Sequence, residues 1–228
     1  MKRETLRRIM DRLIHAVCRP TYIGLENLPA EGAVIIATNH NSRMDTLLLF
    51  INPKRTDVTA LVADKYKKYP LFRWILDTGG VIWLDRENAD FGAVRAAVDA
   101  LNRGLALGIA PEGTRSTTFQ LLEGKSGTAL VALRADVPIV PVGIAGSENI
   151  FRKIFTFQNP KVDIRFGKPF RLEPLDRERR SEQMQEYTDE IMCRIAAQLP
   201  EKYHGHYRGH PRVKEIMELE EDKEVSEQ

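Results

Sequence analysis

The chain has 228 residues, of which 43% are hydrophobic and 29% charged, so one packed globular body is expected rather than a collagen-like, disordered or disulfide-dependent chain. Its 34 Lys and Arg against 32 Asp and Glu give a formal net charge of +2, far from the basicity of a dedicated nucleic-acid binder. From Arg212 onward the net charge is −4, which leaves +6 on residues 1–211. We therefore expect a mildly cationic body, suited to an anionic ligand or an anionic membrane surface, with no nucleic-acid partner.

Cysteine and histidine usage indicates neither a disulfide framework nor a metal centre. Cys18 and Cys193 lie far apart with no CxxC pattern, which predicts free thiols in a reducing compartment. His204, His206 and His210 lack further ligands at a settled spacing, so no metal is predicted. No apolar run approaches the roughly 20 residues of a membrane-spanning helix, and there is no signal-peptide apolar region. The sequence predicts a cytoplasmic protein that spans no membrane.

The chain opens with a basic amphipathic helix, expected within residues 1–20. Over residues 4–18, apolar side chains recur at the spacing of one helix face, while basic side chains occupy much of the remaining surface. The apolar residues are Leu6, Ile9, Met10, Leu13, Ile14 and Val17, and the basic ones are Lys2, Arg3, Arg7, Arg8 and Arg12. Two interpretations stay open: a terminal helix packed on the domain, or a helix lying in the headgroup layer of an anionic membrane.

After Pro29, short apolar runs rich in β-formers alternate with longer helical patterns. This rhythm predicts an α/β fold with a mixed, largely parallel central sheet flanked by helices. The strand-like segments are residues 33–38, 57–63, 79–84, 104–109, 137–143 and 161–166.

Helical patterns lie at residues 91–101, 128–134 and 181–199. Asn88 is the expected N-cap of the first of these helices, and Gly104 is expected to follow its end. We find no internal repeat and no linker rich in Pro, Gly or Ser.

The domain organisation expected from these patterns is simple. Residues 21–200 are expected to form one α/β domain behind the N-terminal helix. Residues 201–228 are expected to form a charged C-terminal tail, either a solvated helix or a frayed segment.

The segment Asn39 to Asp45, with the sequence NHNSRMD, is the sharpest chemical feature, and it lies at a strand-to-helix turn. His40 and Asp45 are five residues apart, about 140° around a straight helix, so they meet only if the turn folds back. An Asp accepting a hydrogen bond from one imidazole nitrogen would fix the tautomer and leave the other nitrogen as a general base. The alternative is a histidine satisfied by local hydrogen bonds beside an Asp in a first helical turn.

Three further segments carry candidate binding residues. Glu112 follows a buried strand and is expected either to accept a hydrogen bond from a substrate or to order its loop, while Arg115 offers a planar fork suited to a phosphate. Arg86 ends another strand and would complete an anion clamp with Arg115. Pro138 and Pro141 indicate an edge or irregular strand near a cleft. Taken singly, each segment also fits a turn, a solvated strand end or a structural strand.

In this order and spacing, the four segments resemble the glycerolipid acyltransferase family of the His-x4-Asp type, whose best-known members are lysophosphatidic acid acyltransferases. NHNSRMD is similar to the family's first motif, GGVIWLDR to the second, PEGTRS to the third and VPIVPVGI to the fourth. The resemblance runs from about Tyr22 to Gly167.

The resemblance implies a reaction and roles for individual residues. His40 would deprotonate the acceptor hydroxyl and Asp45 would orient the imidazole. An acyl group would pass from acyl-CoA or acyl-carrier protein to a lysophospholipid, first of all 1-acylglycerol 3-phosphate, giving phosphatidic acid without a further cofactor. The family's substrate-binding positions correspond to Arg86, Glu112, Gly113, Thr114, Arg115, Lys125 and Pro138.

Two alternatives remain beside this interpretation: an acyltransferase of the same fold with another lyso-lipid acceptor, and a non-catalytic lipid-binding protein. Many family members begin with a long hydrophobic anchor, and this chain offers only the helix of residues 4–18, so a peripheral enzyme at the inner membrane face is expected. Residues 65–74 mix basic and aromatic side chains, which suits a lipid headgroup layer better than single-stranded nucleic acid. Alternatively, many of these aromatic residues belong to the core.

Overall fold

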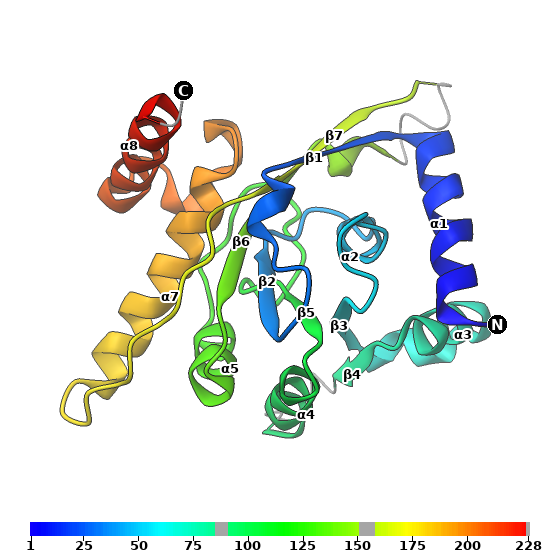
Figure 1. The fold of residues 1–228 in the computed structure, drawn as a ribbon, viewed down its shortest axis with the longest axis horizontal. Helices are drawn as coiled ribbons and strands as arrows, with labels where there is room; N and C mark the ends of the chain where they lie inside the picture. Colours follow the sequence, from blue (N-terminus) through cyan, green and yellow to red (C-terminus); the bar gives the residue numbers. More distant parts are fainter. Residues whose placement is uncertain (85–90, 151–157, 227–228) are drawn as a thin grey trace.

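A seven-stranded sheet, with strands in the order β1-β7-β6-β2-β5-β3-β4, forms the centre of the computed structural model, which describes residues 1–84, 91–150 and 158–226 (Figure 1). All neighbouring strands run parallel except β6 and β7, which pair antiparallel. The expected mixed, largely parallel α/β sheet is therefore confirmed. The strands are β1 (Arg19–Ile23), β2 (Val34–Thr38), β3 (Thr59–Ala63), β4 (Ile82–Leu84), β5 (Ala106–Ile109), β6 (Ile139–Ala145) and β7 (Lys161–Phe166).

Helices cover both faces of the sheet, because its central strands are apolar on both sides. Every residue of β2 is buried, with Val34 and Ile36 in the core beneath α1 and α2, and Ile35 and Ala37 in the core shared with α4, α5 and α7. Such two-sided burial is typical of parallel strands. The helices are α1 (Arg3–Val17), α2 (Asp45–Phe50), α3 (Pro70–Gly79), α4 (Phe91–Asn102), α5 (Gly127–Ala135), α7 (Arg180–Ala197) and α8 (Pro211–Ser226).

Two elements were not predicted from the sequence. Strand β1 contains Pro20 and lacks a regular alternation, yet it pairs in parallel with β7 at the edge of the sheet, where a missing N–H is tolerated. Helix α3 begins with Pro70 in its first turn and ends before Gly80, whose φ of 73° is left-handed. For this reason the strand expected at 79–84 starts only at Ile82.

Strand β6 is central, so of the two alternatives predicted from Pro138 and Pro141, an edge strand or an irregular one, the edge position is wrong. The strand lies between β7 and β2. Pro138 precedes the strand, and its carbonyl accepts a hydrogen bond from Ile35 N at 3.0 Å. Pro141 lies one residue before the pairing with β7 begins at Val142, and its carbonyl accepts a hydrogen bond from Gly167 N at 2.8 Å. Both prolines contribute their carbonyls at positions where a donor is not needed.

The segment expected to be a charged tail packs on the domain, contrary to that prediction. Tyr203 and Tyr207 lie in two short 3-10 turns and are 4% and 1% exposed. Val213 and Ile216 on α8 are also buried, in the same core as α7. These apolar positions stand singly among charged residues, so composition alone suggested solvation. Helix α8 therefore exposes one face and buries the other.

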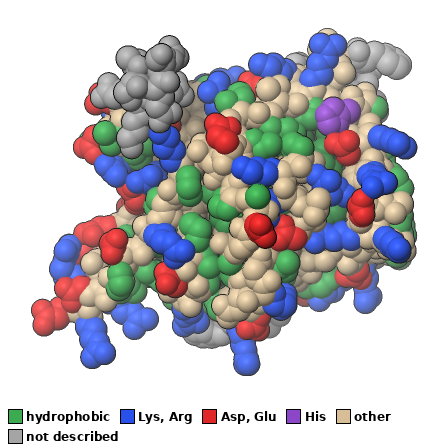
Figure 2. Space-filling model, in the orientation of Figure 1, with side chains coloured by type: hydrophobic (Ala, Val, Ile, Leu, Met, Phe, Trp, Pro, Cys, Tyr) green, Lys and Arg blue, Asp and Glu red, His purple; other side chains and the backbone are tan. Residues whose placement is uncertain are grey.

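Helix α1 is the basic amphipathic helix that the sequence predicts, and it is docked on the domain. Leu6 and Ile14 are buried, while Ile9 and Leu13 remain 41% and 55% exposed. The Arg7 side chain donates to backbone carbonyls at the end of α2. Figure 2 shows Lys and Arg side chains gathered on this side of the molecule, over α1. Within the described ranges, no helix combines the length and apolarity needed to cross a bilayer.

A buried arginine ties together the loops at the amino ends of three strands. Arg55 is 2% exposed, and its guanidinium donates to the carbonyls of Pro29, Gly32 and Gly104 at 2.9–3.2 Å. It also binds both carboxylate oxygens of Asp57, at 2.6 and 2.7 Å. These hydrogen bonds lower the pKa of Asp57. Such a bidentate pair, with its remaining donors satisfied, holds a charge in the interior.

We expect Arg55→Ala to lower the free energy of unfolding by about 3–5 kcal/mol, because it leaves three carbonyls and a carboxylate without their donor. Urea unfolding followed by circular dichroism measures the change. The matched control is Arg171→Ala, which breaks an exposed pair with Asp136 and is expected to cost less than about 1 kcal/mol. Equal losses in the two variants would contradict the structural role of Arg55.

Candidate active site

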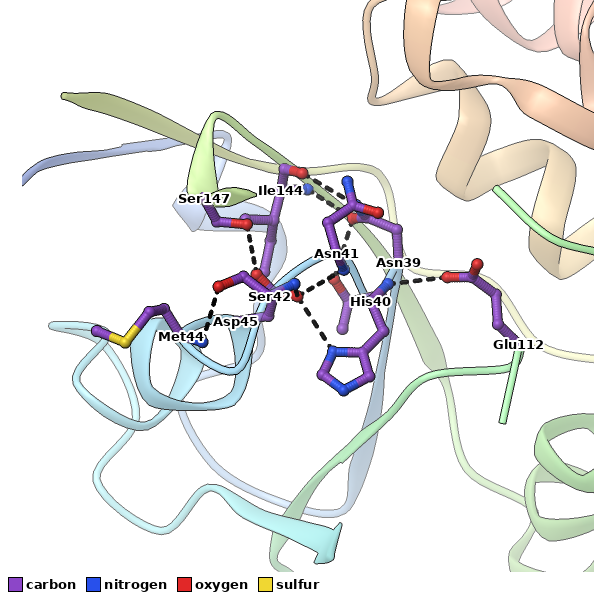
Figure 3. A network of polar contacts seen from close by, with 10 residues as sticks. Asn39, His40, Asn41, Ser42, Met44, Asp45, Glu112, Ile144 and Ser147 are labelled. Atoms are coloured by element: carbon purple, nitrogen blue, oxygen red, sulfur yellow. Dashed lines mark hydrogen bonds and ion pairs between the residues drawn. The ribbon is translucent and has the colours of Figure 1, made fainter. Parts of the chain in front are cut away.

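The candidate site lies at the carboxyl ends of three adjacent parallel strands. His40 follows β2, Glu112 follows β5 and Ser147 follows β6, and β2 pairs in parallel with both of the other strands. The carboxyl ends of such strands meet at one edge of the sheet, where ligands bind in open α/β folds. Figure 3 shows Ser147 and His40 beside Asp45, the first residue of α2, with Glu112 on the other side of His40, at its backbone N–H.

Asp45 and His40 meet because the turn between them folds back. The Asp45 side chain is 1% exposed, and its Oδ2 lies 3.1 Å from His40 Nδ1. The same oxygen accepts hydrogen bonds from the backbone N–H groups of Asn41 and Ser42, at 2.8 and 2.7 Å. With a carboxylate at Nδ1, that nitrogen carries the proton and Nε2 is left as the proton acceptor. The His40 side chain keeps 24% of its surface exposed.

Two residues that the sequence analysis did not single out complete this network. Asn39 joins the end of β2 to β6, since its side chain both donates to and accepts from the backbone of Ile144, at 2.9 and 2.8 Å. Ser147 donates from Oγ to Asp45 Oδ1 at 2.6 Å. Asn39 belongs to the NHNSRMD segment, so its place next to His40 could have marked it as part of the site. Ser147 lies 102 residues beyond Asp45, and no local pattern marks it.

Glu112 is buried and binds two loops rather than facing the cavity. Its side chain accepts from His40 N at 2.8 Å through one oxygen and from Leu122 N at 2.9 Å through the other. Burial raises the pKa of Glu112 to about 7, although both backbone hydrogen bonds oppose the rise. Of the two roles expected for Glu112, ordering the loop is the one that this geometry supports.

A largely apolar cavity of about 1300 Å³ opens beside His40. Residues from α1, α2, α3, α4 and α5 contribute to its wall, so it reaches from the edge of the sheet that carries His40 to the N-terminal helix. The size suits a ligand with long hydrocarbon chains. Its apolar lining includes Leu6, Met10, Phe50, Phe72, Leu76 and Val131.

The polar part of the cavity wall contains several of the predicted binding residues. His40, Gly113, Thr114 and Lys125 line the cavity, together with Arg43, which the sequence analysis did not select. Gly113 has a left-handed φ of 66°, and a Cβ there would lie 3.1 Å from Lys125 Cδ. The glycine therefore lets the lysine side chain pass directly over the loop.

Arg115 and Pro138, two further predicted binding residues, do not line the cavity. Arg115 is half-buried on the same loop as Thr114 but does not line the cavity. Pro138 is level with Val34 at the amino end of the sheet, opposite to the end that carries His40, so the structure does not bring it to the site. Arg86, like the expected N-cap Asn88, lies outside the described residues.

Three histidines near the C-terminus are the residues for which the sequence analysis considered a metal site and predicted none. His204 Nε2 lies 2.9 Å from the Leu199 carbonyl, and His210 Nδ1 lies 3.4 Å from Cys193 Sγ. The His206 ring packs edge-on against Tyr207. In the parts of the chain that the structure describes, no three His, Cys, Asp or Glu side chains are grouped to hold a metal ion.

Comparison with known proteins identifies the family. A model of the acyltransferase family matches residues 19–145, more than half of the chain, and the chain belongs to this family. The 1-acyl-sn-glycerol-3-phosphate acyltransferase of Borreliella burgdorferi is 30% identical over 138 residues, which cover 60% of this chain and 55% of that protein. The enzyme of the same name from Cocos nucifera is 28% identical over 172 residues, covering 73% and 54%. The chain thus spans about half the length of these relatives.

A solved structure resembles the whole fold. The 1-acyl-sn-glycerophosphate acyltransferase PlsC from Thermotoga maritima superimposes with a TM-score of 0.66 at 21% identity, covering 96% of this chain and 79% of that one. The likeness confirms the fold that the four motifs predicted.

The raised pKa of Glu112 predicts a dependence of stability on pH. Because the folded-state pKa of about 7 lies above the usual value of about 4.3, the folded protein binds this proton more tightly. The stability that this bound proton contributes is fully present below the pKa of Glu112 in the unfolded chain. It is lost as the pH rises through the pKa of Glu112 in the folded protein. We expect the free energy of unfolding to fall less between about pH 5 and pH 8 in Glu112→Gln than in the native protein.

Urea unfolding at these two pH values measures the difference. The control Glu123→Gln changes an exposed carboxylate of the neighbouring loop and should keep the native pH dependence. Native and Glu112→Gln proteins with the same pH dependence would contradict the raised pKa.

Proposed function

We propose that the protein transfers a fatty acyl group from an acyl thioester, acyl-CoA or acyl-carrier protein, to the free hydroxyl of a lysophospholipid. The proposed acceptor is 1-acylglycerol 3-phosphate, and the product is phosphatidic acid. The observation that carries the proposal is the His40–Asp45 pair beside an apolar cavity of about 1300 Å³. The names of the relatives from Borreliella burgdorferi and Cocos nucifera support the choice of acceptor.

In the proposed reaction, His40 is the general base. Its Nδ1 is engaged by Asp45, so Nε2 takes the proton from the acceptor hydroxyl as the hydroxyl oxygen attacks the thioester carbonyl. Asp45 stabilises the imidazolium that forms. When the tetrahedral intermediate collapses, the carbon–sulfur bond breaks and His40 returns the proton to the departing thiolate. The new ester keeps the acyl group, and the reaction needs neither an acyl-enzyme intermediate nor a further cofactor.

The cavity offers separate environments for the two parts of the acceptor. Its apolar wall suits hydrocarbon chains, and Arg43 and Lys125 supply positive charge on the wall that also contains His40. A phosphate between these basic groups would set the glycerol hydroxyl near the base. Thr114 and the backbone at Gly113 are further candidates for contact with the acceptor, and Arg115 and Arg86 remain candidates for its phosphate.

The decisive test is release of free thiol from acyl-CoA and acyl-carrier-protein donors in the presence of lysophosphatidic acid, with phosphatidic acid measured in parallel. We expect acceptor-dependent release, and a loss of roughly 100-fold to 10,000-fold in kcat for His40→Ala, because the variant lacks the proton acceptor. The control His206→Ala removes an exposed imidazole away from the cavity and should leave kcat unchanged. Acylation confined to another lyso-lipid would refute the acceptor, and no acyl transfer from any donor would refute the activity.

We also propose that the protein works on an anionic membrane surface. The surface formed by α1, α3 and the 3-10 turn Asp64–Lys68 before α3, called the α1–α3 face below, exposes large apolar side chains beside basic ones. Lys67 and Lys68 lie over the rings of Trp83 and Tyr69, at 5.3 and 5.2 Å from the ring centroids. Basic and aromatic groups together suit the headgroup layer. The exposed apolar residues of this face are Ile9, Leu13, Leu71, Phe72 and Trp74.

The α1–α3 face also forms part of the cavity wall. Leu6 and Met10 of α1 and Phe72, Ile75 and Leu76 of α3 line the cavity from the inside. The helices proposed to meet the membrane are therefore the ones that enclose the hydrocarbon-binding space. On this proposal, a lysophospholipid reaches His40 from the bilayer without passing through water, which would otherwise oppose extraction of its apolar chain.

We expect the double variant Leu71→Ser/Trp74→Ser to bind anionic liposomes more weakly, because it removes exposed apolar groups, 66% and 48% exposed, that would enter the interface. Liposome sedimentation measures the loss. Neither side chain lines the cavity, so turnover of a detergent-dispersed acceptor should be retained. The matched control is Leu219→Ser on α8, whose side chain is 53% exposed at the other end of the molecule (Figure 1).

A triple variant in which Lys65, Lys67 and Lys68 are changed to Glu tests the electrostatic contribution to membrane binding separately from the apolar one. It is expected to lose binding to anionic vesicles, with a smaller effect at high salt. Native-like sedimentation of both the triple and the double variant would exclude the α1–α3 face as the membrane contact.

A further inference from the structure

We infer that Ser147 is a positioning residue that fixes the orientation of the Asp45 carboxylate, and through it the His40 imidazole. Ser147 has no exposed surface and lies in the turn after β6. Its Oγ donates to Asp45 Oδ1 at 2.6 Å, the short distance typical of a hydroxyl bound to a charged carboxylate (Figure 3). The inference rests on the proposed function, because Asp45 matters to catalysis only if His40 is the base.

The two oxygens of Asp45 are held by different parts of the chain. Oδ2 receives His40 Nδ1 and the N–H groups of Asn41 and Ser42, all from the turn that precedes α2. Among the hydrogen bonds of the described residues, the one that reaches Oδ1 comes from Ser147. Three donors on one oxygen fix that atom but still permit the carboxylate plane to rotate about it. The bond at Oδ1 prevents this rotation, and it satisfies a buried oxygen that would otherwise be costly.

The position of Ser147 is itself fixed from both sides. The Tyr203 hydroxyl accepts from Gly146 N at 3.2 Å and donates to Glu148 Oε1 at 2.8 Å, so it holds the residues before and after Ser147. Gly146 has a left-handed φ of 91°, and a Cβ there would lie 2.6 Å from the Lys161 carbonyl oxygen. The turn therefore has little freedom to move, and a rigid donor can fix the acid that it binds.

The links form a continuous chain from the C-terminal segment to the proposed base. Tyr203 holds the turn after β6, Ser147 in that turn holds Asp45, and Asp45 holds His40. In parallel, the paired hydrogen bonds between Asn39 and Ile144 keep the end of β6 beside the turn that carries His40. We therefore assign to Ser147 a role in the orientation of the imidazole, beyond its contribution to packing.

The first test is the kinetics of Ser147→Ala, which removes only the hydroxyl. Because a misoriented base slows the chemical step without changing how the acceptor binds, we expect kcat to fall about tenfold while KM stays within about twofold. The control Thr188→Val removes another buried hydroxyl, one that donates to the Met184 carbonyl at 2.7 Å, and should leave kcat unchanged. Native-like kcat in a folded Ser147→Ala would overturn the inference.

The second test needs no substrate. The proton on His40 Nδ1, hydrogen-bonded to a carboxylate, is expected to give a low-field proton resonance, assigned by its loss in His40→Ala. This resonance should shift or broaden in Ser147→Ala and stay unchanged in Thr188→Val. An unchanged resonance in Ser147→Ala would overturn the inference. A moved resonance in a protein without acyltransferase activity would refute the proposed function and leave the positioning of Asp45 supported.

Tyr203→Phe gives an independent variant if Ser147→Ala does not fold. It keeps the buried ring and removes the hydroxyl that holds Gly146 and Glu148. We expect the same change of the His40 resonance and the same selective loss in kcat, to a smaller degree. A folded Tyr203→Phe protein with a native resonance and native kcat would contradict the chain of contacts.

Discussion

The chemistry proposed for this protein depends on one buried carboxylate. Asp45 sits 1% exposed at the start of α2, a position that is unfavourable for a charge unless donors surround it. Four donors do so: two backbone N–H groups, an imidazole and a hydroxyl. Each comes from a segment whose path is set by the sheet, so the strand order determines which groups reach the carboxylate.

Much of the sheet could be predicted, because buried parallel strands have a simple signature. The runs at Val34 and Ala106 are apolar on both faces and stand between helical patterns, and both are strands. Strand β1 escaped prediction because Arg19 and Pro20 break the pattern and its stability comes from pairing with β7, a distant segment. Helix α3 escaped because Leu71 and Trp74 are exposed beside Ile75 and Leu76, which line the cavity, so the apolar residues of its sequence do not mark one buried face.

At the candidate site, the sequence motif predicted the His40–Asp45 pair but not the residue that holds Asp45 in place. His40 and Asp45 could be paired on paper because five residues of turn suffice to join them. Ser147 could not, since its contact with Asp45 exists only when β6 lies beside β2. The sequence singled out Glu112 but left two roles open for it, because the choice between them depends on burial, which one sequence does not reveal. Pro138 was placed at the site by its motif, whereas the strand register puts it at the far end.

The two ends of the sheet are organised by side chains of opposite type, basic at one end and acidic at the other. At the amino ends a buried arginine, Arg55, collects carbonyl oxygens, and at the carboxyl ends Asp45 and Glu112 collect N–H groups. Loops that would otherwise leave polar backbone groups unpaired are held by one buried side chain at the amino ends and by two at the carboxyl ends. Substitutions in the amino-end loops can therefore alter stability without touching the atoms around His40.

The pairing of β1 with β7 has a consequence for how the chain acquires its structure. Arg19 lies opposite Lys161, so these neighbours in space are separated by about 140 residues along the chain. The region that defines the family, residues 19–145, ends before this partner strand begins. As the chain leaves the ribosome, β1 must wait for about 140 further residues to be synthesised before β7 can pair with it. Closure of such a long loop is slow, so β1 is expected to be among the last of the described strands to find its place.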